Sequence, residues 1–326
     1  MSRTLGASGL AVSPVGLGCN NFGRPGSPTE DQAGTDAVIG AAIDAGITLF
    51  DTADLYGYAF GRSEEMMGRA IGTRRDQILL ATKFGYPDSG APYGGARGSA
   101  SYIRASIEGS LTRLRTDRID LYQMHMPDAA TPIAETLTAL DALVREGKVR
   151  YIGHSNFSAA QMREAAAVAD DLGCTAFVSA QNELSLVNRA ADREELPAAA
   201  ELGLGMLPYF PLANGLLTGK FRRDSFPANS RIMRQRPHVA ETADWEALDA
   251  YRALCDDWGI TMLEATFGWM LAHEPIASVI AGATTPEQVR QNVAAGERWV
   301  PEPEQARQIE ALFPIPASSP SAAPRA

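Results

Sequence analysis

The sequence predicts an α/β fold of eight parallel strands, each followed by a helix, closed into a (β/α)8 or TIM barrel. Short apolar runs rich in Ile, Leu and Val recur about every 25 to 35 residues, separated by Ala-rich stretches with helical periodicity. Continuous apolar runs are typical of parallel strands buried on both faces. Eight strand–helix units close a barrel. The alternative, a doubly wound open sheet, would carry a glycine-rich dinucleotide turn, which is absent.

The expected elements follow in order along the chain. The strands are 15–18, 47–50, 78–82, 119–124, 149–153, 177–180, 204–208 and 278–281. The helices are 33–45, 62–71, 101–114, 134–146, 159–172, 192–201, 261–273 and 286–296. Several helices have clear start signals, namely Thr131 with Pro132, Ser158, and Thr285 with Pro286.

Three segments lie outside the eight units. Residues 3–13 are expected to form a hairpin, with Gly6 and Gly9 at its turn, that closes the N-terminal face of the barrel. Residues 213–245 form a long connection, a feature that is often functional. We expect residues 1–313 to form a single catalytic barrel domain and 314–326 to be a disordered tail, since the tail lacks apolar periodicity.

Composition excludes several classes of function. Twenty-nine Lys and Arg against 39 Asp and Glu give a net charge of −10, which argues against nucleic-acid binding. The three cysteines are widely spaced and the four histidines form no ligand pair, so we expect no disulfide framework and no metal. No 18-residue apolar run occurs, so we expect no membrane span and a cytoplasmic protein.

Polar residues stand where the expected strands end, which is where barrels carry their working residues. Any one of them could be only a turn former or a helix cap. Taken in strand order, they are Asp51, Lys83, His125, Ser155 with Asn156, Gln181 with Asn182, Tyr209 and Gly282.

Of these residues, Lys83 is the hardest to explain as an ordinary exposed side chain. It directly follows an apolar strand, and a buried lysine requires an acidic partner, which Asp51 on the neighbouring strand can supply. Tyr56 lies five residues beyond Asp51. A nearby ammonium would lower the pKa of this phenol, so that it could protonate a carbonyl oxygen. Tyr58 is a rival for this role.

The two strand-end histidines have different expected roles. His125, on the strand next to Lys83, is a candidate for hydrogen bonding to a substrate oxygen. His154 neighbours Ser155 and should point to the opposite face of its strand, so we expect it to be structural.

Two segments on the same rim could bind phosphate. GLLTGKF at 215–221 is one residue short of a P-loop and lacks its Ser or Thr, which argues against a Walker-type NTPase. Backbone amides and one lysine could still bind an anion around Gly215, Leu216 and Lys220. The start of the last expected helix offers a second anion site. Two such sites on one rim suit a dinucleotide.

Nine stretches in order across residues 3–297 are similar to the aldo-keto reductase superfamily. They are TLGASGLAVSPVGLG, FDTADLYG, RSEEMMGRAI, ATKF, DLYQMH, VRYIGHSNFS, QNELS, PYFPLANGLLTGK and AGATTPEQVRQN. The resemblance implies an NAD(P)H-dependent carbonyl reductase with a small-molecule carbonyl substrate. It also implies a catalytic tetrad, with Tyr56 rather than Tyr58 as general acid: Asp51, Tyr56, Lys83 and His125.

The resemblance further implies a cofactor site along the rim. The nicotinamide carboxamide would be held by Ser155, Asn156 and Gln181, with the ring stacked on Tyr209. The pyrophosphate would be covered by Leu212, Gly215, Leu216 and Lys220. The adenosine end would be surrounded by Gly282, Thr284, Gln288, Gln291 and Asn292.

The chain departs from the family pattern at Thr284. Many relatives have a basic residue there, which would pair with the 2′-phosphate of NADPH. Gln291 likewise replaces a frequent Glu. We expect NADPH as the cofactor, with NADH as the alternative. Compensating cations could come from Arg290, Arg222, Arg223 or Arg231.

Two other functions compete with the reductase. The family's potassium-channel β-subunits are similar, so a cofactor-bound regulatory subunit with slow turnover is one alternative. A barrel hydrolase or aldolase with Lys83 as a Schiff-base nucleophile is another. Substrate choice should depend on loops 20–30, 86–98 and 213–242, with Phe22, Tyr58 and Tyr86 lining an apolar pocket. The sequence indicates no oligomeric state.

Overall fold

The computed structural model describes residues 2–227, 230, 232–233 and 236–315, and it contains the expected barrel. Eight strands pair in parallel in the order β10-β3-β4-β5-β6-β7-β8-β9. A parallel bridge between Met206 and Ile276 joins the two edges, and the Ala277 amide donates to the Met206 carbonyl at 2.9 Å. The strands are β3 (Val15–Gly18), β4 (Leu49–Asp51), β5 (Leu79–Phe84), β6 (Ile119–Met124), β7 (Val149–Ser155), β8 (Ser179–Gln181), β9 (Gly205–Met206) and β10 (Val279–Gly282).

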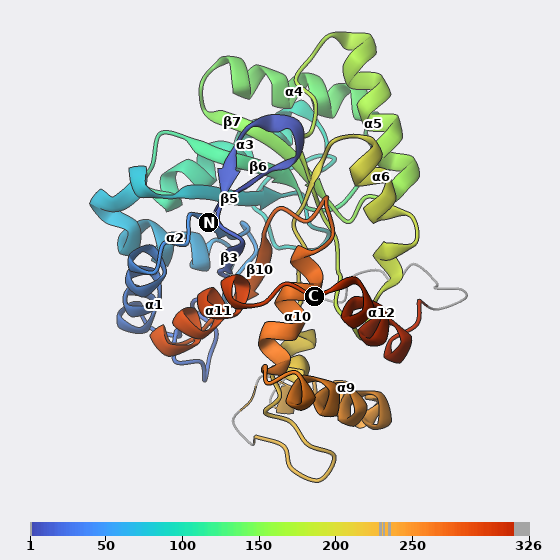
Figure 1. Ribbon diagram of the computed structural model, residues 1–326. Coiled ribbons are helices and arrows are strands. Elements are labelled where there is room, and N and C mark those ends of the chain that lie inside the picture. Colours follow the sequence, from blue (N-terminus) through green and yellow to red (C-terminus); the bar gives the residue numbers. More distant parts are fainter. Residues whose placement is uncertain (1, 228–229, 231, 234–235, 316–326) are drawn as a thin grey trace.

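Helices surround the barrel (Figure 1). Neighbours pack in sequence from α1 to α6, and α11 packs against both α10 and α1. No helix in the described part of the chain is long and apolar enough to cross a bilayer. The surrounding helices are α1 (Gln32–Asp44), α2 (Arg62–Ile71), α3 (Ala100–Leu114), α4 (Ile133–Arg145), α5 (Ala159–Leu172), α6 (Glu195–Glu201), α10 (Met262–Leu271) and α11 (Pro286–Arg298).

The helix start signals have local physical causes. Ser158 forms a capping box with Gln161 at α5, and Thr285 accepts a hydrogen bond from the Gln288 amide at α11. The expected cap at α4 is wrong in detail. Pro132 occupies the cap position there, and the Thr131 hydroxyl donates to Asp128 instead.

In the described part of the chain, three further α-helices were not expected. They are α8 (Pro237–Glu241), α9 (Trp245–Asp257) and α12 (Pro303–Leu312), none of which belongs to a simple strand–helix alternation. Asp244 caps α9 by accepting from the Ala247 amide. Helix α9 lies against α10 and α12 at the bottom of Figure 1. The expected helix 192–201 is divided into η3 (Ala190–Asp192) and α6. Of the expected tail, residues 316–326 lie outside the described residues.

The barrel interior is apolar at the bottom and polar at the top. The hairpin of β1 (Arg3–Thr4) and β2 (Ala11–Val12) closes the bottom as predicted. Its apolar side chains join inward-facing strand residues in one buried cluster, which includes Leu5, Leu10, Val12, Leu49, Ala81, Leu121 and Leu207. Side chains two residues apart on a strand share a face. Two residues beyond Leu49, Ala81 and Leu121 the same inward face therefore carries Asp51, Lys83 and Gln123.

The hairpin turn packs tightly against the start of β9. Gly6 has φ +53°, and a Cβ there would lie 2.2 Å from the Gly203 carbonyl oxygen and 2.5 Å from the Gly205 nitrogen. Gly9 also has a left-handed φ, +74°, but a Cβ there would meet nothing within 4 Å.

Gly6→Ala should therefore destabilise the protein more than Gly9→Ala. We expect losses in the free energy of unfolding of about 2–4 kcal/mol for Gly6→Ala and about 1–2 kcal/mol for Gly9→Ala, because only the first adds a backbone clash to the left-handed strain. Urea denaturation of the two variants measures the difference. Equal losses would contradict the close packing of hairpin and barrel.

Candidate active site

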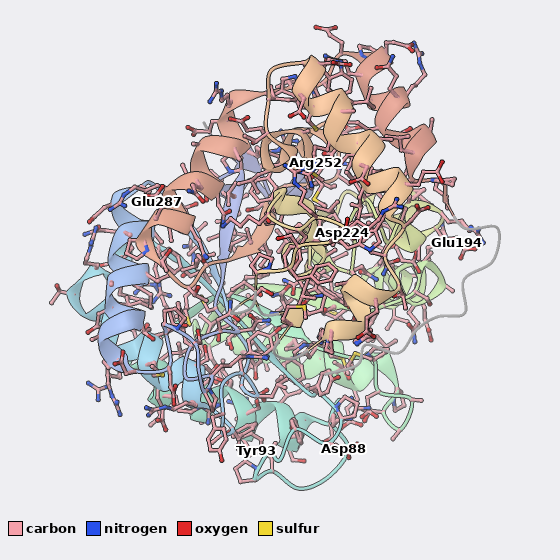
Figure 2. All side chains as sticks on the ribbon, turned by 90° about the horizontal axis from the view of Figure 1, so that it is seen from below. Asp88, Tyr93, Glu194, Asp224, Arg252 and Glu287 are labelled. Carbon is pink, nitrogen blue, oxygen red and sulfur yellow. The ribbon has the colours of Figure 1, made fainter. Side chains whose placement is uncertain are left out.

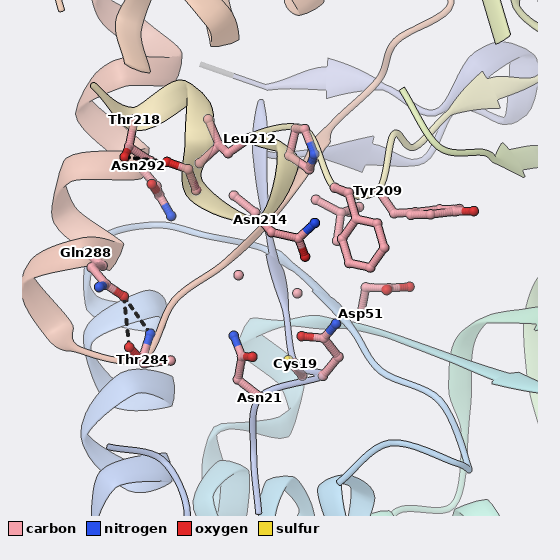
Figure 3. A pocket seen from close by; sticks show the side chains of 18 of the residues that line it. Cys19, Asn21, Asp51, Tyr209, Leu212, Asn214, Thr218, Thr284, Gln288 and Asn292 are labelled. Carbon is pink, nitrogen blue, oxygen red and sulfur yellow. Dashed lines mark hydrogen bonds between the residues drawn. The ribbon is translucent and has the colours of Figure 1, made fainter. Parts of the chain in front are cut away.

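A cavity of about 960 Å³ lies at the carboxyl ends of the strands. Figure 3 shows its long axis, with Asp51 and Tyr209 toward one end and Thr284, Gln288 and Asn292 toward the other. Most of the residues predicted for the site line this one cavity. They are Asp51, Tyr56, His125, Ser155, Asn156, Gln181, Tyr209, Leu212, Gly215, Lys220, Gly282, Thr284, Gln288, Gln291 and Asn292.

The four predicted catalytic residues come together at one end. Lys83 is fully buried behind the cavity wall, where its Nζ donates to Asp51 Oδ2 at 2.7 Å and to the Thr52 carbonyl at 2.9 Å. The same Nζ lies 5.1 Å from the centroid of the Tyr56 ring. The Tyr56 and His125 rings meet edge to face, with centroids 5.8 Å apart. The structure thus brings all four side chains into contact or near-contact.

The second oxygen of Asp51 is also satisfied. Its Oδ1 accepts from the amide nitrogens of Gln123 at 3.2 Å and Gln181 at 3.0 Å. Gln123 is fully buried on β6 and was missed in the sequence. Its position in the sequence could have identified Gln123 as a site residue, because a polar residue on the inward face of an otherwise apolar strand requires a partner.

Burial is the largest influence on the pKa values of the Tyr56 and Lys83 side chains. It raises the pKa of Tyr56, and the Lys83 ammonium reduces this rise without reversing it. The expectation of a lowered Tyr56 pKa is therefore wrong, because desolvation of the phenolate outweighs the neighbouring cation. Burial lowers the pKa of Lys83, but Asp51 and Tyr56 more than offset it, so the net shift is upward.

His125 is neutral at physiological pH. Burial and then the Lys83 charge hold its pKa well below the usual range. Its Nδ1 is buried and has no hydrogen-bond partner among the described residues. At neutral pH the site therefore combines a phenol that keeps its proton, an ammonium ion and an uncharged imidazole.

Asn156 connects the ends of three strands. Its backbone has φ +62°, and its Nδ2 donates to the His125 carbonyl at 2.9 Å and to Ser155 Oγ at 3.0 Å. Its Oδ1 accepts from the Tyr209 hydroxyl at 2.8 Å, which fixes the Tyr209 ring beside the cavity. The Ser155 hydroxyl donates to the Gln181 carbonyl at 2.8 Å. This network orders the wall next to Tyr56.

His154 lies away from the cavity, as expected. Its ring stacks on Phe157 with centroids 4.5 Å apart and meets Phe177 edge to face at 5.1 Å. Burial lowers its pKa to about 3.

The segment after β9 forms the wall opposite the strand ends. Its backbone is left-handed at Ala213, Asn214 and Gly215, inside η4 (Ala213–Thr218). Leu216 is buried in the core and does not line the cavity, unlike its predicted companions Leu212, Gly215 and Lys220. Asn214 Oδ1 is buried without a hydrogen-bond partner among the described residues.

The far end of the cavity is uncharged on its α11 side. The Thr284 amide and hydroxyl both donate to Gln288 Oε1, at 2.8 and 3.1 Å (Figure 3). Arg290 does not line the cavity but pairs with Glu287 at 3.6 Å, on the outside of the molecule (Figure 2). Arg222 and Arg223 do not line it either, and Arg231 lies outside the described residues.

The expected substrate-lining residues are partly wrong. Tyr86 lines the cavity and meets His125 edge to face, with centroids 4.9 Å apart. Phe22 is fully buried in the core, and Tyr58 is 79% exposed on its loop, so neither lines the cavity. Arg24 and Arg236, which do line it, were not predicted.

A second cluster of buried charge supports the loop that carries Tyr56. Glu64 accepts from Thr82 Oγ1 at 2.6 Å and from Arg113 Nε at 2.7 Å. Asp54 is fully buried nearby, and its Oδ2 accepts a long hydrogen bond from Ser106 at 3.4 Å. Burial, and then the charge of Glu64, raises the pKa of Asp54 to about 8. Asp54 therefore holds a proton at neutral pH.

Comparison with known proteins places this barrel in a class of oxidoreductases. The Aldo/keto reductase family model matches residues 14–313, and the chain belongs to this family. It is therefore an oxidoreductase of a family that generally uses NAD(P)H.

Relatives with different descriptions match nearly the whole chain. "Uncharacterized oxidoreductase YrpG" of Bacillus subtilis (strain 168) is 38% identical, covering 96% of this chain and 95% of the relative. "Probable voltage-gated potassium channel subunit beta" of Oryza sativa subsp. japonica is 33% identical over 90% of each chain. "L-glyceraldehyde 3-phosphate reductase" of Escherichia coli (strain K12) is 31% identical, covering 90% of this chain and 86% of the relative.

Asp54→Asn should make the stability of the protein less dependent on pH. The folded-state pKa of about 8 lies above the unfolded value, so the folded state binds the extra proton and loses stability as pH rises from about 4 to 8. The amide is never charged and avoids this loss. Thermal unfolding between about pH 5 and 8 should show a smaller fall in Tm for Asp54→Asn than for the wild type. Asp171→Asn, at an exposed position of α5, is the control and should follow the wild type. Parallel curves for all three proteins would contradict a protonated Asp54.

Proposed function

We propose that this protein reversibly reduces an aldehyde or a ketone to an alcohol with NADPH, and that Tyr56 donates the proton. The observation that carries the proposal is the Tyr56 phenol, kept protonated by burial, next to Lys83 and His125 at one end of a long cavity. Acid catalysis needs a group that still holds its proton at the working pH.

The cavity has the chemistry that a dinucleotide requires. Amide and hydroxyl groups of Ser155, Asn156 and Gln181 would hold the nicotinamide carboxamide beside Tyr209. Lys220 and the left-handed backbone around Gly215 would hold the diphosphate. The buried Asn214 Oδ1, which lacks a partner among the described residues, fits a wall meant to face a polar ligand. The adenosine end would meet the start of α11.

Bound nicotinamide supplies or accepts the hydride. Tyr56 gives its phenolic proton to the carbonyl oxygen as negative charge develops there. The Lys83 ammonium stabilises the phenolate left behind, and Asp51 holds that ammonium in place at 2.7 Å. The neutral His125 ring faces Tyr56 and hydrogen-bonds the same substrate oxygen. Every one of these groups is held by the strand ends or by the short loop after β4.

Tyr56→Phe should abolish most of the reductase activity without weakening cofactor binding. We expect kcat to fall about 10²- to 10⁴-fold, because only the proton donor is removed. Tyr58→Phe is the matched control and should stay fully active, since Tyr58 is exposed and outside the cavity. Oxidation of NADPH by an aromatic aldehyde, followed at 340 nm, measures both.

The pH dependence tests the same assignment. Because burial raises the pKa of Tyr56, reduction should be flat through neutral pH and fall only above about pH 10, where the phenol loses its proton. Alcohol oxidation needs the phenolate and should rise over the same range. Full activity of Tyr56→Phe would exclude Tyr56 as the donor. Tight NADPH binding without turnover in the wild type would favour a regulatory subunit instead.

NADPH is proposed with a modest preference over NADH. Lys220 adds positive charge to the cavity wall, but the α11 face carries no cation toward the adenosine end. Thr284→Arg should tighten NADPH binding about tenfold by pairing with the 2′-phosphate, and leave NADH binding unchanged. Arg290→Gln, on the outer face of α11, should change neither affinity. Nucleotide fluorescence titrations measure these constants, and an equal gain for NADH would contradict the placement of the 2′-phosphate beside Thr284.

A further inference from the structure

Two arginines lie at the catalytic end of the cavity, where the sequence had led us to expect an apolar pocket. Arg24 comes from the loop between β3 and α1, and Arg236 directly precedes α8. Both are half-buried and line the same cavity as Tyr56 and Tyr86. They approach it from loops that are far apart in the chain.

The position of Arg24 is built into its loop. Its Nε donates to the Asn20 carbonyl at 2.6 Å, and its own carbonyl accepts from the Ser27 amide at 3.2 Å. The guanidinium interacts electrostatically with the Tyr56 hydroxyl, and burial lowers the pKa of Arg24. A partly buried guanidinium is stabilised when an opposite charge approaches it.

Arg236 lies close to the same point from the other side. Its guanidinium stacks over the Phe210 ring, with Cζ 5.0 Å from the centroid. Its charge acts on the hydroxyls of Tyr86 and Tyr209 and on Arg24 itself. Two neighbouring positive charges repel each other, and an anion between them would offset that repulsion.

The charge balance of the cavity wall supports the binding of an anion near these two arginines. Among the described residues, the lining carboxylates are those of Asp51 and Glu264. Asp51 is paired with Lys83 at 2.7 Å and Glu264 with Arg298 at 3.1 Å. The cations Arg24, Arg236 and Lys220 therefore leave the wall with a positive surplus. Lys220 lies in the segment proposed for the diphosphate, whereas the charges of the two arginines act on Tyr56, Tyr86 and Tyr209.

We propose that the preferred substrates are carbonyl compounds that carry an anionic group, a carboxylate or a phosphate, which Arg24 and Arg236 hold while the carbonyl oxygen meets Tyr56. This inference rests on the proposed reductase function and names its substrate class. The planar guanidinium fork suits both anions, because each offers two oxygens to paired N–H donors. The bound charge also positions the carbonyl, so discrimination should appear in KM more than in kcat.

The test compares substrates that differ only in charge. Reduction of 4-formylbenzoate and of its neutral isostere 4-formylbenzamide is measured with saturating NADPH. We expect the carboxylate to have a KM at least about tenfold lower, with similar kcat values. Raising the salt concentration should raise the KM of the carboxylate alone. Using 4-formylphenyl phosphate as a third substrate distinguishes phosphate from carboxylate, and a low KM for either anion supports the proposal.

Variants assign the effect to the two arginines. Arg24→Gln and Arg236→Gln should each raise the ratio of the KM for the anionic substrate to the KM for 4-formylbenzamide about tenfold. Arg24→Lys keeps the charge and should recover part of the preference, which guards against a folding defect in Arg24→Gln. Arg307→Gln on α12 removes an equivalent charge from an exposed side chain outside the cavity and should have no effect.

The outcomes separate this inference from the reductase proposal. Turnover of 4-formylbenzamide with an equal KM for the carboxylate would overturn the anion proposal alone. A rise in the Kd of NADPH in both variants, without a change in substrate preference, would assign the arginines to cofactor binding. That result would also overturn the anion proposal. If neither aldehyde turns over, the reductase proposal fails. Calorimetric binding of 4-(hydroxymethyl)benzoate against its amide, with NADP⁺ present, then decides the charge preference without chemistry.

Discussion

The buried ion pair between Lys83 and Asp51 determines how the rest of the site is built. An ammonium and a carboxylate in a closed barrel are tolerated only if every polar atom finds a partner, since an unpaired buried charge costs several kcal/mol. Here Lys83 uses Asp51 and the Thr52 carbonyl, and it interacts with the Tyr56 ring. The remaining Asp51 oxygen takes two glutamine amides. Both charges of the pair are therefore satisfied, although Gln123 Oε1 beside them has no hydrogen-bond partner among the described residues.

These hydrogen bonds tie the site to the closure of the barrel. In the strand order, β4 and β8 are four places apart, on opposite sides of an eight-stranded ring. The 3.0 Å hydrogen bond from Gln181 on β8 to Asp51 on β4 therefore crosses the barrel interior. This hydrogen bond can form only when the sheet has curled into a barrel. The Asp51 carboxylate that positions Lys83 therefore gains its last partner from the tertiary fold. Below it, the apolar cluster that contains Leu49 and Leu121 excludes water from the same interior.

Much of the barrel and of the candidate site could be predicted from the sequence, because both depend on the periodicity of the strands. Apolar runs located the strands, and the residues that followed them placed Asp51, Lys83 and His125 on one rim. Counting in twos from Leu121 would also have found Gln123. Desolvation could not be predicted, since the burial of Tyr56 depends on neighbours from several strands, and this reversed the expected direction of its pKa shift. Loop conformations were equally inaccessible, which is why Phe22 and Tyr58 were wrongly assigned and Arg24 was missed.

The groups proposed for the chemistry and those proposed for substrate selectivity therefore come from different parts of the chain. The groups proposed to move the proton are fixed by strand ends or by the short loop after β4, and the barrel holds them whatever the substrate. Arg24 and Arg236 come instead from two loops outside the strand ends. Loops tolerate sequence change that strands do not. A barrel can therefore keep its strand-end groups while its loops change what enters the cavity, and relatives of similar identity do carry different descriptions.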